Sequence, residues 1–149
     1  MEFCYNQPMT DEKIIVSACL AGLRCRYDGE TKPCEKVVEM VAAGKALPVC
    51  PEQLGGLPTP RVPAEMRGGR VMRQDGVDVT AEFIRGAQES LMLAQLVGAT
   101  KAILKSRSPS CGSEAIYDGS FSGKLIPGDG VTAALFKANG IHVITEEDL

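Results

Sequence analysis

Three of the six cysteines lie at the ends of apolar runs that are typical of buried strands. Cys19 follows the run 13–18, Cys50 follows the run 46–49, and Cys111 lies in the loop after 101–105. In an open parallel sheet, the loops at the carboxyl ends of the strands share one edge, where ligands bind. The sequence therefore predicts that three thiols from distant segments converge. Three buried free thiols remain the alternative, since cysteine is common in protein cores.

Three converging thiols suggest a metal centre with soft ligands. Ligation by thiolates alone favours zinc, copper(I) or iron–sulfur clusters over hard cations. The C-x-x-C pairs of structural zinc sites and nucleobase deaminases do not occur in this sequence. Three thiolates on a four-iron cubane leave one iron open, and an open iron is a Lewis acid that can take a substrate directly. An iron–sulfur cluster is therefore favoured over zinc.

The other cysteines and the single histidine have simpler explanations. Cys34 falls on the apolar stripe of a predicted helix, where cysteine acts as a small core residue. Cys25 is near the predicted thiol cluster without an assigned role. Cys4 lies in an N-terminal leader, residues 1–12, that we expect to be flexible. His142 lies near the start of the last apolar run, 141–144, far from the predicted edge, and is expected to be structural or exposed.

Polar side chains near the thiols could serve catalysis. Glu52 stands two residues after Cys50 and is held by Pro51, so a desolvated carboxylate there could act as a general acid or base. An exposed loop carboxylate is the alternative.

The segment before Cys111 is also polar. Ser108 and Ser110 place two hydroxyls beside that thiol, and Lys105 and Arg107 lie just upstream. These groups could hold a substrate oxyanion or phosphate. Ordinary solvated loop residues are the alternative.

Alternating strands and helices must position these residues. The first three predicted strands are the runs named above, and the fourth is 141–144. The predicted helices begin near Pro33, at an N-cap Thr80 and at an N-cap Asp129, and stop at Gly44, Gly98 and Gly140. This order predicts a single α/β domain over 13–149, a Rossmann-like three-layer fold whose mostly parallel sheet has helices on both faces.

The predicted helices have apolar faces, and the connections between elements are irregular. Segment 51–63 is a shaped loop with four prolines, Asp75-Gly76 predicts a small β-hairpin insertion, and 114–128 is expected to be a polar loop. Two helix faces are expected to be buried: Ile84, Ala87, Leu91 and Ala94, and then Val131, Ala134, Leu135 and Ala138.

Composition bounds the class of protein. The chain has 149 residues, a net charge of −3, and 44% hydrophobic against 23% charged residues, which is typical of one globular domain and not of a disordered chain. The acidic balance argues against a general nucleic-acid binder. No apolar run is long enough for a membrane helix, and the start does not resemble a signal peptide, so we expect a cytoplasmic protein. The oligomeric state is left open.

Four segments in order carry a resemblance to a known family. They are VSACL at 16–20, CRYDG at 25–29, VCPEQLGGLPTPR at 49–61 and KSRSPSCG at 105–112. Together they resemble the thiouracil desulfidase family over residues 13–145, formerly a domain of unknown function.

The resemblance implies an oxygen-sensitive [4Fe-4S] cluster on Cys19, Cys50 and Cys111, with the fourth iron open. A cluster of this kind can be absent from protein handled in air. Glu52 and Ser108 match the family's proposed catalytic groups. The implied reaction replaces the thiocarbonyl sulfur of a small thiolated pyrimidine, thiouracil or a 4-thiouridine nucleotide, by oxygen and releases hydrogen sulfide. We expect no nucleic-acid polymer and no membrane as partner.

Weaker candidates for substrate binding come from the same loops. They are Ser17, Arg61, Lys105, Arg107 and Ser110. Two other functions remain open: a non-catalytic thiol or iron–sulfur redox sensor, and a zinc-dependent hydrolase that uses Glu52. No basic patch or helix-turn-helix pattern supports the sensor.

Overall fold

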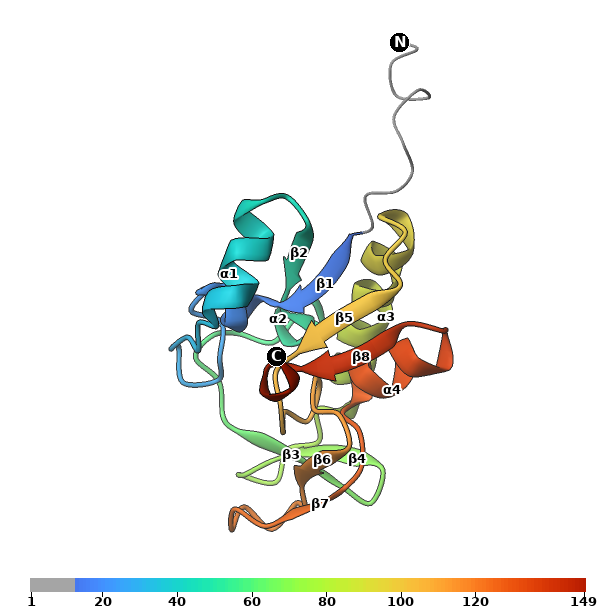
Figure 1. Ribbon diagram of the computed structural model, residues 1–149. Coiled ribbons are helices and arrows are strands. Elements are labelled where there is room, and N and C mark those ends of the chain that lie inside the picture. The colour runs from blue at the N-terminus through green and yellow to red at the C-terminus, as the bar shows by residue number, and fades with distance from the viewer. Residues whose placement is uncertain (1–12) are drawn as a thin grey trace.

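A four-stranded parallel sheet forms the centre of the molecule (Figure 1). The computed structural model describes residues 13–149, so the predicted leader and Cys4 lie outside the described residues. The strand order is β2 (Ala46–Val49), β1 (Ile14–Ser17), β5 (Lys101–Leu104) and β8 (His142–Thr145), and each neighbouring pair is parallel. The predicted parallel sheet is confirmed.

Helices cover both faces of this sheet (Figure 1). Helix α1 (Glu35–Ala42) buries Val37 against Val16 and Ile103 on one face. Helices α3 (Thr80–Leu96) and α4 (Val131–Ala138) cover the other face, where Phe136 shares a core with Ile15. Neighbouring strand residues point to opposite faces, which is why Ile15 and Val16 belong to different cores.

The strand order places a crevice beside β1. The chain passes from β1 to β2 on one side of β1, and it later returns through α3 to β5 on the other side. Such a reversal opens a crevice at the carboxyl ends of the strands, where ligands bind in open α/β sheets. The 3-10 helix η2 (Ala18–Ala21), helix α2 (Pro51–Leu54) and the loop 105–112 start from these three strand ends.

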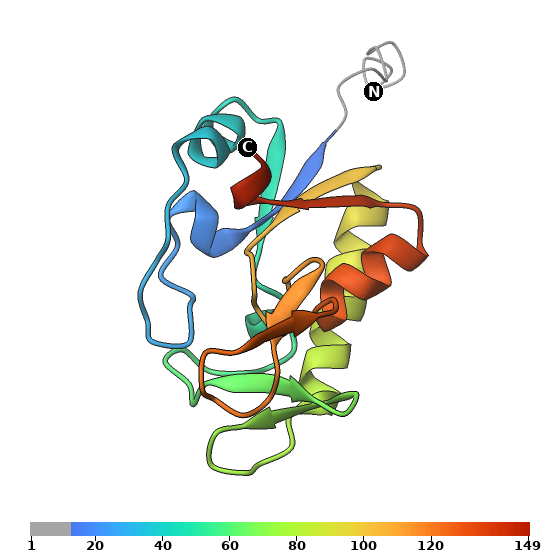
Figure 2. The ribbon, with the colours of Figure 1, turned by 60° about the horizontal axis from the view of Figure 1, so that its bottom comes forward.

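Two antiparallel hairpins extend beyond that edge (Figure 2). Strands β3 (Ala64–Arg67) and β4 (Arg70–Arg73) meet at Gly68-Gly69, where both glycines have positive φ, as a tight two-residue hairpin requires. The expected small antiparallel hairpin is confirmed, but its full ladder turns at Gly68-Gly69. At Asp75-Gly76 the chain also turns back on β4, where it forms only the antiparallel bridge between Met72 and Asp78 and the two backbone hydrogen bonds that flank it.

The second hairpin corrects the expected polar loop at 114–128. Strands β6 (Ala115–Tyr117) and β7 (Leu125–Pro127) pair antiparallel within it. The residues of β7 are all exposed, so this strand has no buried alternation by which the sequence could reveal it.

The helix faces and starts differ in part from expectation. Ile84 is exposed, and Phe83 is buried with Ala87 instead. In α4 the buried residues are Thr132, Ala133 and Phe136, while Ala134 and Ala138 are exposed. Thr132 can be buried because its hydroxyl is hydrogen-bonded to that of Ser110. The helical spacing of apolar residues cannot predict this pairing.

The helix starts also differ by one or two residues from expectation: α1 and α4 begin later, and α3 begins one residue earlier. Cys34 is the N-cap of α1, and Thr80 is the first helical residue of α3, after the N-cap Val79. Gly130 is the N-cap of α4, and Asp129 instead accepts a hydrogen bond from the Glu114 amide. His142 is exposed, as expected.

Helix α2 packs closely against α3 at two glycines, Gly55 and Gly86. A Cβ atom at Gly86 would lie 1.9 Å from the carbonyl oxygen of Pro51, and one at Gly55 would lie 2.0 Å from that of Glu82. Neither partner is a flexible side chain. The backbones of the two helices therefore touch only because both positions lack a side chain, and this contact sets the position of the residues on α2.

We expect Gly86→Ala to destabilise the protein by about 3 kcal/mol, because the new methyl group forces α2 away from α3. Thermal unfolding would show a Tm lower by about 10 °C. Gln88→Ala, on the exposed face of α3, is the matched control and should leave the Tm nearly unchanged. Equal Tm values for both variants would contradict the contact.

Candidate active site

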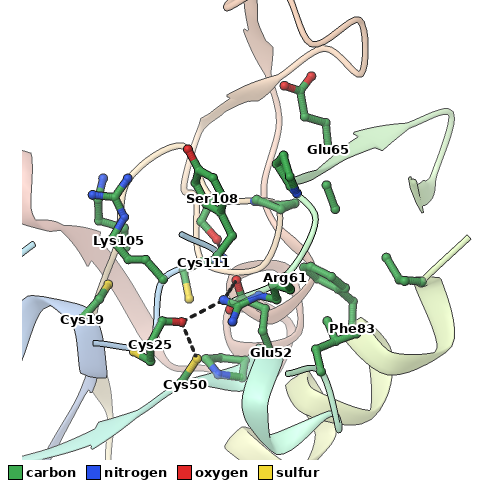
Figure 3. A pocket seen from close by; sticks show the side chains of 18 of the residues that line it. Cys19, Cys25, Cys50, Glu52, Arg61, Glu65, Phe83, Lys105, Ser108 and Cys111 are labelled. Atoms are coloured by element: carbon green, nitrogen blue, oxygen red, sulfur yellow. Dashed lines mark hydrogen bonds and ion pairs between the residues drawn. The ribbon is translucent and has the colours of Figure 1, made fainter. Parts of the chain in front are cut away.

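One pocket of about 630 Å³ opens at the predicted edge of the sheet (Figure 3). Cys19 follows β1, Cys50 follows β2, and Cys111 comes from the loop after β5; all three line this pocket. The predicted convergence of the three thiols is confirmed. Cys25 also lines the pocket.

The thiols of this pocket are largely withdrawn from solvent. Cys25 is 4% exposed and Cys111 is 3% exposed. Burial, together with the nearby charge of Glu52, raises the pKa of Cys111 to about 12. The contact with Cys25, and then burial, raises the pKa of Cys50. A metal that binds these sulfurs must therefore displace their protons.

Cys25 is the thiol that the sequence left without a role. Contact with the Cys19 thiol raises the pKa of Cys25 to about 11, and the Cys50 thiol contacts it as well. Its backbone carbonyl also accepts a weak hydrogen bond of 3.7 Å from the Cys50 thiol. The loop after η2 turns back on itself, since the Lys32 amide and the Thr31 hydroxyl both donate to the carbonyl of Cys19. This reversal of the loop places Cys25 in the pocket, and no local sequence pattern predicts that position.

The donor set fits a cluster better than a single ion. Within residues 13–149, no group of three histidine, cysteine or acidic side chains is placed to hold one metal ion. Zinc needs its ligands around one point. In a four-iron cubane each thiolate binds a different iron, so soft thiols spread around one pocket suit it.

Glu52 enters the pocket from the first turn of α2 (Figure 3). Its side chain is 15% exposed, and its Oε2 atom lies 3.3 Å from Nη2 of Arg61, which is 9% exposed. Glu52 is thus a partly desolvated carboxylate paired with a buried cation. Arg61 lines the pocket as well, and its guanidinium is engaged by this pair and by the carbonyl oxygens of Pro58 and Cys25.

The hydroxyl of Ser108 is oriented by its own loop. Its Oγ accepts hydrogen bonds of 3.0 Å from the amides of Ser110 and Cys111. Arg107, just before it, has a left-handed backbone with φ 66°. Because both bonds use oxygen lone pairs, the Ser108 proton remains available to donate.

The Ser108 loop is locked to the start of α4. The amides of Val131 and Thr132 donate to the carbonyls of Pro109 and Ser110, which satisfies the first turn of the helix. A Cβ atom at Gly130 would lie 2.5 Å from the carbonyl of Ser110. The loop that carries Ser108 and Cys111 is therefore built on a rigid support.

The remaining candidates are placed as follows. Ser17 is buried, lines the pocket and accepts a hydrogen bond of 2.8 Å from the Lys105 amide. Ser110 corrects the expectation: it is fully buried and hydrogen-bonded to Thr132, so it has no surface for a substrate. Lys105 and Arg107 both line the pocket.

Both of these cations are paired with the C-terminal 3-10 helix η3 (Glu146–Asp148). Lys105 lies 3.4 Å from Glu146, and Arg107 lies 3.0 Å from Glu147. Burial opposes ionisation of Glu146, but hydrogen bonds from the Ser106 amide and hydroxyl, with the charge of Lys105, leave its pKa lowered. The C-terminal segment thus holds two side chains that line the pocket.

Known proteins share both the sequence and the fold. A family model described as 2-thiouracil desulfurase matches residues 14–148. The chain belongs to the 2-thiouracil desulfurase family. The resemblance inferred from the four motifs is thereby confirmed.

Two relatives of this chain cover almost its full length. It is 47% identical over 146 residues to the uncharacterised protein YbbK of Bacillus subtilis (strain 168), covering 91% of this chain and 97% of that protein. A solved structure described as the [4Fe-4S]-dependent thiouracil desulfidase TudS is 51% identical, has a TM-score of 0.89 and covers 93% of both chains. The predicted α/β fold with its mostly parallel sheet is confirmed by this match.

Proposed function

We propose that this chain is a [4Fe-4S]-dependent desulfidase that replaces the thiocarbonyl sulfur of a thiolated pyrimidine by oxygen. The observation that carries the proposal is that Cys19, Cys50 and Cys111 share one pocket with Glu52 and Ser108. The 51% identity to a protein described as a [4Fe-4S]-dependent thiouracil desulfidase supports it.

The three thiols would hold the cluster as thiolates, one on each of three irons. When bound, the cluster supplies an open, soft Lewis-acidic iron that suits a thiocarbonyl sulfur. Cys25 contacts two of these thiols but is not assigned as a ligand.

Glu52 would accept the proton of the attacking water, and Ser108 would orient the substrate. The carboxylate of Glu52 takes a proton from a water molecule as the water oxygen attacks the thiocarbonyl carbon. The Ser108 hydroxyl donates a hydrogen bond that orients the pyrimidine. The products are the pyrimidine carbonyl and hydrogen sulfide, so one water is consumed and no net oxidation occurs.

The pocket suits a small molecule. A volume of about 630 Å³ is in the usual range of ligand pockets. Lys105 and Arg107 at its border would favour a nucleotide over a free base, although Glu146 and Glu147 offset their charge. We place the reaction in the cytoplasm, where reduced thiols persist. No helix within residues 13–149 is long and apolar enough to cross a membrane.

Anaerobic reconstitution followed by a sulfide-release assay tests the proposal. We expect about four irons and four acid-labile sulfides per chain, with release of sulfide from thiouracil or 4-thio-UMP. A colourless protein with one zinc would instead support the hydrolase. A protein that binds the cluster but releases no sulfide from either compound would support the redox sensor.

Ser108→Ala removes the hydroxyl donor and two hydrogen bonds to amides. We expect sulfide release to fall roughly 100-fold, a loss comparable to that of one preorganised donor. Ser122→Ala, on the exposed β6–β7 loop, is the matched control. Unchanged turnover in Ser108→Ala, with iron content equal to the wild type, would remove Ser108 from the mechanism.

A further inference from the structure

Arg61 is a largely buried cation that bonds two other segments of the pocket, at Cys25 and Glu52, as well as its own loop (Figure 3). Its Nη2 atom donates to the carbonyl of Cys25 at 2.9 Å and to Oε2 of Glu52 at 3.3 Å. Its Nη1 atom donates to the hydroxyl of Thr59 at 3.0 Å and to the carbonyl of Pro58 at 3.3 Å. A guanidinium with this many acceptors is fixed in both position and plane.

Only one of these four acceptors carries a charge. The acceptors on Cys25, Pro58 and Thr59 are neutral, so they hold the guanidinium without cancelling it. Glu52 is the only acid that forms an ion pair with Arg61 in the part of the chain that the structure describes. The positive charge of Arg61 is therefore directed at Glu52.

The ion pair also orients the carboxylate of Glu52. Its Oε2 atom is bound to Arg61, while within residues 13–149 its Oε1 atom accepts no hydrogen bond. This side chain lines the pocket and is partly exposed. A carboxylate held by one oxygen presents the other oxygen in a constant direction, which a proton acceptor requires.

The negative charge of Glu52 would repel thiolates formed in the same pocket. Glu52 stands two residues after Cys50 and lines the same pocket as Cys50 and Cys111, so its negative charge lies beside both sulfurs. A metal centre on these sulfurs requires those thiolates. A cation paired with Glu52 offsets this repulsion, since opposite charges interact strongly where water is excluded.

We propose that Arg61 is a positioning residue that aims one carboxylate oxygen of Glu52 into the pocket and compensates the charge of Glu52 beside the thiolate ligands. This inference rests on the proposed function, because it assigns those ligands and the role of Glu52. In this proposal Arg61 acts through Glu52 and does not itself bind the substrate.

A double-mutant cycle on cluster lifetime tests the charge compensation. Wild type, Arg61→Met, Glu52→Gln and the double variant are reconstituted anaerobically, and the loss of visible absorbance is followed in excess iron chelator. We expect Arg61→Met to shorten the half-time about tenfold, because it leaves Glu52 as an unpaired, partly desolvated charge. In the Glu52→Gln background the same substitution should change the half-time less than about twofold.

Steady-state kinetics test the positioning role. Arg61→Met should lower kcat about 100-fold and change KM less than about threefold, because the proton acceptor is misaligned while the substrate site is intact. Arg61→Lys keeps the positive charge but lacks the planar guanidinium with its two terminal nitrogens. It should retain intermediate activity and a near-normal cluster lifetime. Arg70→Met, which breaks the pair with Asp78 outside the pocket, is the control and should match the wild type in both measurements.

Two outcomes would overturn the proposal. An equal shortening of the half-time in both backgrounds would mean that Arg61 only supports the backbone at Cys25 and Pro58. A raised KM with an unchanged kcat would make Arg61 a substrate-binding residue. If Arg61→Met does not fold, the same cycle is run with Arg61→Lys and Arg61→Gln. A wild type that holds its cluster but releases no sulfide would refute the proposed function, whereas the lifetime cycle would still report on Arg61.

Discussion

Glu52→Gln is expected to lower the rate of sulfide release from a thiolated pyrimidine about 1000-fold, while the protein still binds about four irons per chain. Glutamine keeps the shape of the side chain and its place on α2, but it cannot accept a proton from water. Its amide can still contact Arg61, so the pocket should remain assembled.

The measurement compares turnover with iron content in the same preparation. Glu89→Gln, an exposed residue on α3, is the matched control and should turn over like the wild type. Full turnover in Glu52→Gln would show that another group accepts the proton. Loss of iron together with turnover would show that Glu52 supports the metal centre instead.

Replacing Cys19, Cys50 or Cys111 by Ala is expected to abolish the cluster, leaving less than about one iron per chain and no measurable sulfide release. A three-ligand cluster has no spare protein ligand, so each of the three losses should be severe. Iron analysis and the visible spectrum after anaerobic reconstitution check this result.

Two other cysteines serve as controls for the ligand set. Cys34→Ala lies at the start of α1, outside the pocket, and should reconstitute like the wild type. Cys25→Ala should also bind about four irons, because Cys25 is not among the proposed ligands. Loss of the cluster in Cys25→Ala, with retention in one of the three proposed ligand variants, would require the ligand set to be reassigned.

Much of this protein follows from local sequence signals. Short apolar runs that end at Cys19 and Cys50 have the length and composition of buried parallel strands, and both strands are found there. Glycines such as Gly98 and Gly140 have positive φ at helix ends, where a residue without a side chain is favoured. Alternating strands and helices then leave few topologies, which is why the edge shared by the three thiols could be predicted.

The errors occur where burial depends on a distant partner. Thr132 is buried because Ser110 satisfies its hydroxyl, and no helical period indicates that. Strand β7 is exposed along its length and is recognised only through its pairing with β6.

The sequence by itself determined the type of fold, the family and the segments that approach the pocket, because strand length, turn chemistry and motif order are local properties. Only the tertiary structure decided that Cys25 contacts Cys19 and Cys50, that Arg61 is paired with Glu52, and that Ser110 is fully buried against Thr132. These are contacts between segments up to 36 residues apart, as between Arg61 and the carbonyl of Cys25. Their geometry exists only once the chain has closed around the pocket.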